Sequence, residues 1–567
     1  KQYTNAPYLV KDDGYFLRDG EKEMVWDQTT KEAIPHDERG KNAALEGTFT
    51  VKGEQVRPAF QVFMEHLSDA TPEWAEQICG VPAKQIRQVA KELGENAMIG
   101  STIEVDGITL PYRPVGIMAY HMAQQELGFQ AIRAMVMVTM LLGAVGAVGG
   151  QRSDFTWKIH SNYQKLDQIE IKDPPYNIWL KDSMFFPINS NNSSLVAWVQ
   201  QNPDKYGVET TPEVLLIHMC NPITAFPDQR MLMEMYEKVK FIAVIDPWMS
   251  KTADYYADVV LPAATIEKYE GPMGVSDQYV DAETLRIPPV APLFQSRGEI
   301  DIYLDLCEQA GILYGEGGYL DQINDAMHLE DEFALSLESK PTVREIFDRW
   351  AKSNGIEDGV AYFEEKGVQV KGPVAATDYY GYAGDPAFGG AIHRLYGESL
   401  LRYREEMQAK GVEEIYWQDY TALPKWRTPT MDTSPDKYDL YLVSFKKIEF
   451  KQSRASHIPL LSELAPKQYL EINPRTARGR GIEDGNEVWV ESHNAVSGET
   501  RRVKVIARFC ESIRPDTIAM PHHYGEIVRH PWSLGQGSTP NQLFFTGEGY
   551  VANTADQSFH VKVRVYK

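Results

Sequence analysis

The sequence predicts an α/β fold that ends in a β-barrel domain, and two parts of the chain carry this prediction. Residues 241–246, FIAVID, form a continuous apolar run whose length and β-branched content are typical of a buried parallel strand. A similar run begins at Val214, and the helical-looking residues 229–238 lie between the two runs. Near the C-terminus, short β-branched runs separated by turn signals such as EDGN and SGE predict the barrel.

The two central runs, with the helical segment between them, predict a βαβ unit. Each run ends in a polar turn, where a ligand could bind. The first ends at Cys220-Asn221-Pro222 and the second at Asp246. In open α/β sheets, ligands bind at the carboxyl ends of such strands, and an Asp there suits a sugar hydroxyl or a guanine edge. The alternative is an ordinary βαβ unit in which Asn221 and Asp246 only cap loops, and the pattern alone leaves both interpretations open.

The composition describes a large, acidic, globular protein. The chain has 567 residues, 43% of them hydrophobic, which is enough for about three or four domains. Its net charge is −23, from 80 acidic and 57 basic residues. This balance argues against a nucleic-acid-binding protein, whose affinity rests on neutralising phosphates. We interpret the acidity as a solvated surface, which still leaves room for a local basic pocket.

The cysteines and the apolar segments exclude two further classes. Cys79, Cys220, Cys307 and Cys510 are far apart and form no CxxC pair, so the usual spacings predict neither a zinc ribbon nor an iron–sulfur cluster within this chain. The longest apolar segment, residues 131–148, contains a charge and several glycines. We expect a buried helix and turn there rather than a transmembrane helix.

Signals for the starts and ends of helices occur in the first half of the chain. Residues 70–93 predict two helices separated by Gly80, the first capped by Thr71 with Pro72 in its first turn. We expect a strand at NAMIGST, from Asn96, and a long helix over residues 116–142 that ends in GAVGAVGG. Residues 151–204 are polar and Pro-rich, which predicts an excursion loop.

Later segments predict one helix, an irregular region and the barrel strands. SRGEIDIYLDLCEQAG reads as a helix with an acidic first turn, and residues 315–437 are expected to be helical and irregular. The barrel strands are expected at residues 438–443, 487–491, 502–507 and 561–565.

Residues 245–271, IDPWMSKTADYYADVVLPAATIEKYEG, resemble the molybdopterin oxidoreductases of the dimethyl sulfoxide reductase family. In that family a strand-terminal Asp precedes a T-A-x-x-A-D-V-V-L-P run and an E-K/R-x-x-G segment. YTNAPYLV at residues 3–10 and LEINPRTARGRGIEDGNEVWVES at residues 470–492 resemble the family as well. The resemblance implies an α/β fold with a doubly wound nucleotide-binding domain plus a C-terminal β-barrel domain. The expected regions are the end of a preceding α/β domain (1–95), a molybdopterin guanine dinucleotide-binding α/β domain (96–330), a helical and irregular connection (331–437), and a β-barrel dinucleotide-binding domain (438–567).

A basic turn at residues 444–457, SFKKIEFKQSRASH, stands out in this acidic chain. A local excess of positive charge favours an anionic cofactor, although a charge run is more often a solvated loop. In the family this turn wraps the pterin and the metal, and the resemblance therefore favours the cofactor.

The resemblance also implies a set of cofactor-binding residues. Five belong to one guanine-nucleotide arm: Asn221, Ile245, Asp246, Lys268 and Asp301. The others are expected at the pterins or as late contacts: Ser444, Lys446, Lys447, Gln452, Ser453, Arg454, Ser456, His457, His523 and Asn541. His523, in MPHHYGE, has the alternative role of a packed histidine. For His121 and Gln124 we expect a core or capping role, with a position facing the cofactor as the alternative.

The family's metal-ligand motif and its [4Fe–4S] cysteine cluster are not found in this sequence. The chain opens without Met and without a signal peptide, in KQYTNAPYLV. We therefore expect a processed or fragmentary N-terminus, with both motifs upstream or in a separate polypeptide. None of the four cysteines matches a family ligand position, so no direct metal ligand is expected here and no catalytic residue is assigned.

The function implied by the resemblance is that of the catalytic subunit of a bis(molybdopterin guanine dinucleotide) oxidoreductase with molybdenum or tungsten. The expected reaction is two-electron, oxygen-atom transfer on a small substrate of the polysulfide, thiosulfate or arsenate type. The alternatives are a formate dehydrogenase, a cofactor-free scaffold of a respiratory complex, and an unrelated nucleotide-binding enzyme. The expected partners are a membrane anchor subunit, plus an iron–sulfur electron-transfer subunit. The expected location is periplasmic or membrane-associated through a partner, with the cytoplasm as the alternative.

Overall fold

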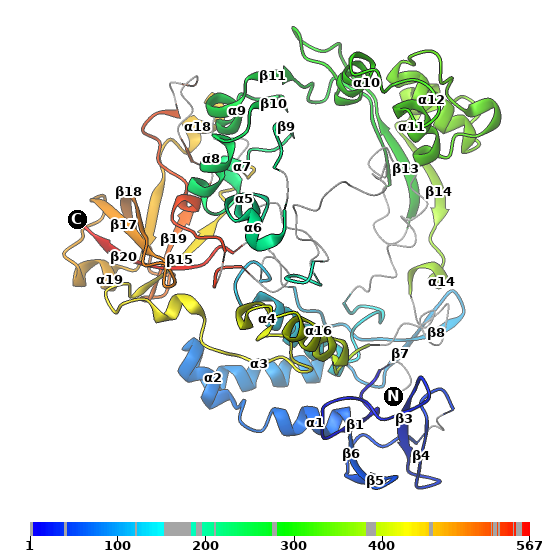
Figure 1. Cartoon of the computed structure of the whole chain (residues 1–567), viewed down its shortest axis with the longest axis vertical. Coiled ribbons are helices and arrows are strands. Elements are labelled where there is room, and N and C mark those ends of the chain that lie inside the picture. The colour runs from blue at the N-terminus through cyan, green and yellow to red at the C-terminus, as the bar shows by residue number, and fades with distance from the viewer. Residues whose placement is uncertain are drawn as a thin grey trace.

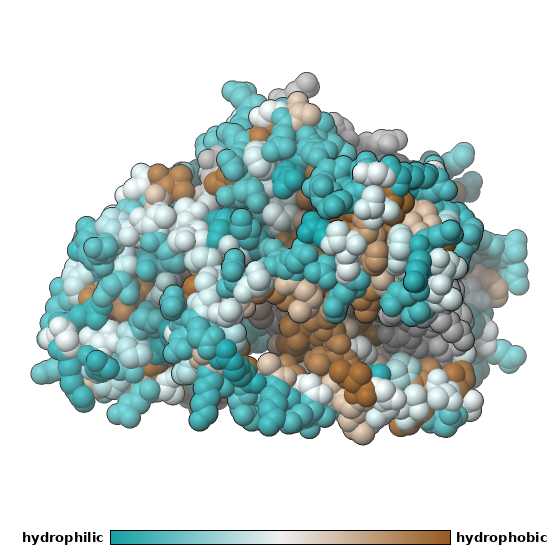
Figure 2. Space-filling model, turned by 90° about the horizontal axis from the view of Figure 1, so that it is seen from below, coloured by the Kyte–Doolittle hydropathy of each residue, from teal (hydrophilic) through white to brown (hydrophobic). Residues whose placement is uncertain are grey.

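The computed structural model describes residues 4–38, 42–118, 122–151, 183–188, 195–208, 211–274, 280–380, 393–452, 458–522, 524–525, 530, 533–547, 549–551 and 558–567. The N-terminal strands, the helical lobe around α11 and α12, the parallel sheet and the barrel lie around a ring, with the barrel at the far side from the N-terminal strands (Figure 1). The face seen from below is largely hydrophilic, with hydrophobic residues gathered toward its centre (Figure 2).

The N-terminal region consists of small antiparallel sheets followed by helices. One sheet has the order β1-β6-β5 and another has the order β2-β3-β4. The strands are β1 (Leu9–Lys11), β2 (Arg18–Asp19), β3 (Lys22–Asp27), β4 (Glu32–Pro35), β5 (Phe49–Val51) and β6 (Glu54–Pro58). The helices are α1 (Ala59–His66), α2 (Pro72–Cys79) and α3 (Ala83–Asn96).

The predicted helix pair after residue 70 is confirmed, together with its capping. Thr71 Oγ1 accepts a hydrogen bond from Trp74 N at 3.2 Å, and Gly80 ends α2 in the left-handed conformation, which favours glycine. The strand expected from Asn96 is wrong, because α3 continues to Asn96 and the chain then turns. The hairpin begins later, with β7 (Thr102–Val105) and β8 (Ile108–Pro111).

The expected long helix over residues 116–142 is shorter than predicted. The helix α4 (Gly128–Leu141) begins twelve positions later. A Cβ at Gly128 would lie 2.0 Å from the carbonyl oxygen of Ala123, so the chain needs glycine at this tight start. Among the described residues, none of the helices is long and apolar enough to cross a bilayer. Most of the predicted excursion loop, residues 151–204, lies outside the described residues, which resume as α5 (Leu195–Gln201) and α6 (Pro203–Tyr206).

The predicted βαβ unit is confirmed as a parallel sheet of order β11-β10-β9. Its elements are β9 (Val214–His218), α7 (Pro222–Ala225), α8 (Gln229–Tyr236), β10 (Phe241–Asp246), α9 (Lys251–Tyr256) and β11 (Val259–Pro262). Ile245 pairs with His218 and Asp246 pairs with Pro262. The parallel register therefore brings the carboxyl ends of all three strands to one edge.

A helical lobe and an antiparallel sheet follow. The sheet has the order β12-β13-β14, from β12 (Glu270–Gly274), β13 (Val280–Arg286) and β14 (Val368–Pro373). The lobe contains α10 (Glu299–Gln309), α11 (Tyr319–Met327), η3 (Asp331–Phe333), α12 (Val343–Ser353) and α13 (Val360–Lys366). The acidic first turn of α10 is as predicted, whereas β14 was not predicted. The lobe has one core that runs from Leu285 to Phe363, and the predicted boundary at residues 330 and 331 falls inside it.

The connection to the barrel is helical and irregular, as expected. It contains α14 (Ala376–Tyr379), α16 (Glu398–Ala409), α17 (Glu414–Trp417) and η5 (Thr430–Thr433). Arg427 fastens it to the start of α4, because its guanidinium bonds both buried Glu126 and buried Asp419.

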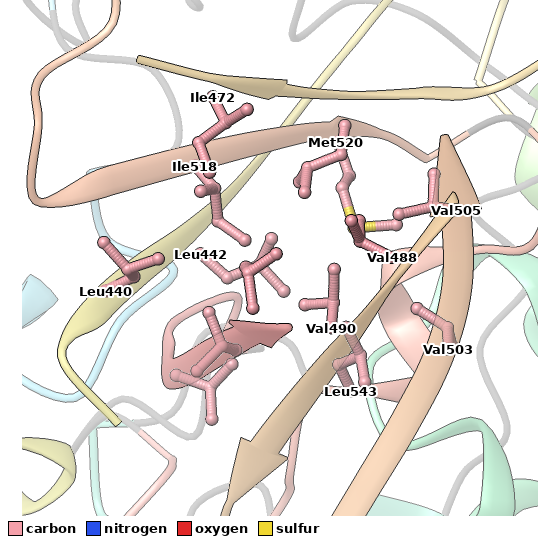
Figure 3. Close-up of a cluster of buried hydrophobic side chains, with 14 of the residues drawn as sticks. Leu440, Leu442, Ile472, Val488, Val490, Val503, Val505, Ile518, Met520 and Leu543 are labelled. Carbon is pink, nitrogen blue, oxygen red and sulfur yellow. The ribbon is translucent and has the colours of Figure 1, made fainter. Parts of the chain in front are cut away.

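The predicted C-terminal barrel is confirmed and is closed, in the order β15-β19-β16-β18-β17-β20. Its elements are β15 (Leu440–Phe445), α18 (Pro459–Leu464), β16 (Tyr469–Ile472), α19 (Pro474–Gly479), β17 (Glu487–His493), β18 (Thr500–Phe509), β19 (Thr517–Pro521), η7 (Pro540–Gln542) and β20 (Val561–Tyr566). Alternate residues point inward, such as Val488 and Val490 on β17, and fill the interior with aliphatic side chains (Figure 3). Each fully buried side chain of this kind contributes about 1.5–3 kcal/mol. The strands β16 and β19 were not predicted.

Candidate functional site

The register of the barrel places two loops at the same end. Strands β15 and β19 are parallel neighbours, with Ser444 opposite Met520 and Phe445 opposite Pro521. The basic turn after β15 and the loop after β19 therefore leave the barrel side by side. His522 Nε2 lies 3.2 Å from Gln452 Oε1, which joins the two loops directly.

A pocket of about 810 Å³ opens at this end of the barrel. Four residues of the predicted set line it: Ser444, Lys446, Gln452 and Asn541. Its other lining residues include Gln124, Tyr441, His522 and His560. Lysine, histidine and amide side chains are present among its described lining residues, and Asp and Glu are not. In a chain of net charge −23, this is a lining suited to an anionic ligand.

A second pocket, of about 410 Å³, lies at the carboxyl edge of the parallel sheet. Asn221, Asp246 and Lys268, three of the five residues expected at the nucleotide arm, line it, and Gln452 belongs to it as well. Gln452 and Ala225 line both pockets, so the two adjoin. Together they form what we call the paired pocket.

The helix α7 and the loop that follows it hold the two halves of the paired pocket together. Asn541 Nδ2 donates to the carbonyls of Thr224 and Ala225, at 2.8 and 3.0 Å. Behind this contact, buried Asp228 accepts from Thr546 N at 3.0 Å and pairs with Arg501 at 2.7 Å. The parallel sheet is thus bonded to the barrel through buried groups.

Hydrogen bonds to nearby loop and helix residues hold the side chains of Asn221 and Asp246 in place. Asn221 Oδ1 accepts from the amide of Thr252 at 3.2 Å and from its hydroxyl at 2.9 Å, which ties the end of β9 to the start of α9. Asp246 Oδ1 accepts from Trp248 N at 2.9 Å. These are the capping contacts that the alternative interpretation expected, and both residues line the pocket at the same time.

Lys268 is bound to a carboxylate that the sequence did not single out. Its ammonium donates to both carboxylate oxygens of Glu299, at 2.5 and 2.6 Å, and its side chain is 4% exposed. Burial opposes ionisation of Glu299, but nearby His218 and Lys268 hold the pKa of this carboxyl below its usual value. Lys268 is therefore a fixed charge at the wall of the pocket.

Three predicted residues lie outside the paired pocket. Ile245 is fully buried on β10 against Ala263 and Ile302, and it does not line the pocket. Asp301 lies in the first turn of α10, where burial raises the pKa of its carboxyl. Lys447 lies 3.9 Å from Glu449 and does not line either half. The remaining predicted residues are outside the described part of the chain: Ser453, Arg454, Ser456, His457 and His523, together with His121.

Some lining residues had no sequence signal, or a misleading one. In MPHHYGE the predicted residue, His523, is outside the described residues, and its neighbour His522, which was not predicted, lines the pocket. Gln124, for which we expected a core or capping role, lines the pocket. Its backbone carbonyl accepts a hydrogen bond from Phe559 N at 3.0 Å. His560 directly precedes β20, more than a hundred residues from the basic turn, and only the closed barrel brings it there.

Two residues that line this region hold buried polar atoms without partners among the described residues. Asn541 Oδ1 and both ring nitrogens of His560 have no hydrogen-bond partner among the described residues, although these atoms are shielded from water. Such atoms are costly unless a ligand satisfies them. Burial lowers the pKa of His560 to about 4, so its imidazole is neutral at neutral pH. Within the described residues, groups of three or more His, Cys, Asp or Glu that suit a metal ion are not found.

Comparisons with known proteins identify the family. Residues 32–309 match the family described as molybdopterin oxidoreductase, and residues 440–554 match the molydopterin dinucleotide binding domain. The chain belongs to the molybdopterin oxidoreductase family. The second matched region contains the basic turn and the barrel strands β15 to β19, and the first contains the parallel sheet.

Curated relatives extend over most of this chain but are longer proteins. A sulfite dehydrogenase subunit of Allochromatium vinosum is 22% identical, over 91% of this chain and 62% of its own length. Dimethyl sulfoxide/trimethylamine N-oxide reductase of Cereibacter sphaeroides is 24% identical, over 82% and 54%. The thiosulfate reductase molybdopterin-containing subunit of Salmonella typhimurium is 23% identical, over 83% and 58%. The chain therefore spans little more than half the length of these relatives.

A solved structure shows the same fold. Acetylene hydratase from Pelobacter acetylenicus superposes with a TM-score of 0.60 at 15% sequence identity, covering 90% of this chain and 66% of that one. The α/β fold with its C-terminal barrel is thus shared with that solved structure.

Proposed function

We propose that this molybdopterin oxidoreductase holds a bis(molybdopterin guanine dinucleotide) cofactor, with molybdenum or tungsten, in and beside the paired pocket. The observation that supports this most is the junction of the two pockets at Ala225 and Gln452. One half has the carboxyl edge of a parallel sheet, which suits a nucleotide, and the other has the cationic and amide lining that suits a pterin with its phosphates.

The residues present fit such a group by their donor and acceptor chemistry. Asp246 offers carboxylate oxygens to guanine or ribose donors, and Asn221 lies beside it. Ser444, Lys446 and Gln452 would bind the pterin side, with Lys446 balancing negative charge. Asn541 Oδ1 and the His560 ring nitrogens, which have no partner among the described residues, would gain one. When bound, the metal of this cofactor supplies two-electron, oxygen-atom transfer.

We propose a small oxyanion or sulfur compound as the substrate, of the polysulfide, thiosulfate or arsenate type. The support is the extent of the similarity. The sulfite dehydrogenase, thiosulfate reductase and dimethyl sulfoxide/trimethylamine N-oxide reductase relatives align over 91%, 83% and 82% of this chain, and all three names contain a sulfur compound. Formate dehydrogenase major subunits of Escherichia coli and Haemophilus influenzae align over 45% each. A formate dehydrogenase is therefore the second candidate, and a cofactor-free scaffold is disfavoured by the unsatisfied buried atoms.

Partners and location follow from the same proposal. A two-electron reaction at the cofactor needs an electron carrier, so we propose as partners a membrane anchor and an iron–sulfur subunit, with a [4Fe–4S] cluster close to the cofactor. The relatives named as subunits of sulfite dehydrogenase and thiosulfate reductase are in keeping with such assemblies. We propose a membrane-associated location on the periplasmic side.

Elemental analysis of the native protein tests the proposal, with pterin extraction after oxidation. One molybdenum or tungsten ion and two pterins for each chain are expected. Asp246→Ala should lower the pterin and metal content, while Asp19→Ala, at an exposed position of β2, should not. A well-folded native preparation without metal and pterin would overturn the proposal and favour the scaffold.

A further inference from the structure

A polar pocket of about 390 Å³, separate from the paired pocket, lies between the N-terminal strands and the start of α16. It shares no lining residue with the paired pocket. The N-terminal strands beside it lie at the end of the molecule away from the barrel (Figure 1). Its walls come from segments almost 400 residues apart, including Tyr8 and Arg18 on one side and Arg394 and Arg402 on the other. Its volume is within the range of roughly 300–1,000 Å³ typical of small-molecule sites.

The two carboxylates of this pocket share one arginine. Glu398 is 6% exposed and accepts from Phe16 N at 2.7 Å and from Arg18 Nη1 at 2.8 Å. Arg18 also donates to Glu23 at 3.1 Å, and His36 lies 3.7 Å from the same Glu23. Arg18 thus binds both carboxylates, and with Arg394 and Arg402 the described lining has three arginines against two carboxylates.

The remaining donors, exposed Arg394 and Arg402 and half-buried Ser399, make no direct polar side-chain contact within the described part of the chain. Arg394, Arg402 and Ser399 line the pocket, and their side chains make no hydrogen bond or ion pair within 4 Å with any described residue. Arg402 lies one turn after Glu398 on α16, close enough to Glu398 for its charge to favour the ionised carboxylate. Two guanidinium groups and a hydroxyl therefore face one space in a chain whose net charge is −23.

We propose that this pocket binds a small tetrahedral oxyanion, such as sulfate or phosphate, through Arg394, Arg402 and Ser399. One guanidinium fork satisfies one carboxylate, whereas donors from three positions suit a ligand that presents three or more oxygens. The first turn of α16, which has no side-chain cap, adds a favourable dipole. The site is independent of the proposed cofactor, since none of its residues contributes to the paired pocket.

Calorimetric titration of the purified full chain with sodium sulfate, and then with sodium phosphate, tests this site. Ionic strength is held constant with sodium chloride so that screening does not change. We expect saturable binding, with R394Q and R402Q each weakening it at least about tenfold and S399A weakening it less. R475Q, at an exposed arginine of α19 without an ion pair among the described residues, should bind as the wild type does.

Three outcomes would overturn the proposal. In the first, the folded wild type binds neither anion saturably. In the second, R394Q and R402Q both bind as the wild type does. In the third, the protein binds malonate, a dicarboxylate, but neither sulfate nor phosphate. Far-UV circular dichroism and thermal unfolding of each variant show whether it is folded. If R394Q or R402Q fails to fold, R394K and R402K, which keep the charge but lose the guanidinium fork, replace them in the titration and should also weaken binding. A failure of metal or pterin analysis leaves this test unaffected.

Discussion

Asn541 Nδ2 donates to the carbonyl of Ala225 at 3.0 Å, and this bond joins the barrel to the parallel sheet at the point where their pockets meet. Asn541 is 1% exposed and belongs to η7, more than three hundred residues after Ala225. The same amide group donates to Thr224 O, so one side chain satisfies two buried carbonyls. Its oxygen has no hydrogen-bond partner among the described residues, and Asn541 lines the larger half of the paired pocket.

Asn541→Ala should therefore reduce both stability and cofactor content. Removing the amide leaves the carbonyls of Thr224 and Ala225 unsatisfied, at about 1–3 kcal/mol each. Denaturant unfolding measures the free energy, and pterin extraction measures the cofactor. Asn42→Ala, at an exposed asparagine, serves as the matched control. An Asn541→Ala protein with wild-type stability would contradict the role of this contact.

Asp228 and Arg501 form the buried ion pair behind the same interface. Their closest atoms are 2.7 Å apart, and Asp228 also caps α8 by accepting from Met231 N at 3.2 Å. Arg501→Gln should cost about 3–5 kcal/mol of unfolding free energy because it leaves a buried carboxylate without its counter-charge. Asp228→Asn with Arg501→Gln should recover part of that loss, because the uncompensated charge is gone. A double-mutant cycle measured by denaturant unfolding decides this, and purely additive losses would count against the pair.

His560 should affect the cofactor more than the fold. Its ring nitrogens have no hydrogen-bond partner among the described residues, so His560→Leu is expected to leave the cofactor-free chain equally stable or more stable. The same change should lower pterin content if the imidazole binds the cofactor. Pterin extraction and thermal unfolding are the two measurements. Loss of stability without loss of pterin would contradict the proposed role.

The same histidine predicts a pH dependence. Burial lowers the pKa of His560 from 6.5 to about 4, so the unfolded chain binds more protons than the folded chain between these values. The stability of the wild type should therefore fall as the pH drops through this window, relative to His560→Leu. Unfolding free energies of the two proteins between pH 7 and about pH 4 test this, and parallel curves would be the opposing result.

Glu491 on β17 predicts a second pH effect with a lower window. Burial opposes its ionisation, yet Arg564, Tyr438 and Tyr566 donate to it at 3.0, 2.7 and 2.9 Å and lower its pKa from 4.5 to about 2. A depressed carboxyl pKa stabilises the fold above the unfolded value and loses that contribution as the pH falls toward the folded value. The wild type should exceed Glu491→Gln in stability above pH 4.5 and converge with it below. Glu487→Gln, on the same strand but 64% exposed, should show no such convergence.

The sequence by itself determined the elements whose signals are local. The apolar runs at residues 214 and 241 predicted parallel strands, Thr71 and Gly80 predicted the limits of α2, and alternating β-branched residues predicted the barrel. These signals depend on side-chain periodicity and on backbone preferences within a few residues, which a single chain displays directly. Asn221 and Asp246 were found in the same way, because strand ends mark an edge of the sheet.

Only the tertiary structure decided which distant groups share a space. The start of α4 depends on a close approach of Gly128 to Ala123, and the role of His560 depends on barrel closure, neither of which has a local signature. Lys268 was expected at a ligand, but its ammonium is bound to Glu299, thirty-one residues later. Arg394 and Arg402 resemble ordinary surface charges until the chain places them opposite Arg18, which has already bound the nearby carboxylates. Long-range contacts of this kind form because burial and charge pairing outweigh the entropy of closing long loops, and sequence periodicity does not encode that balance.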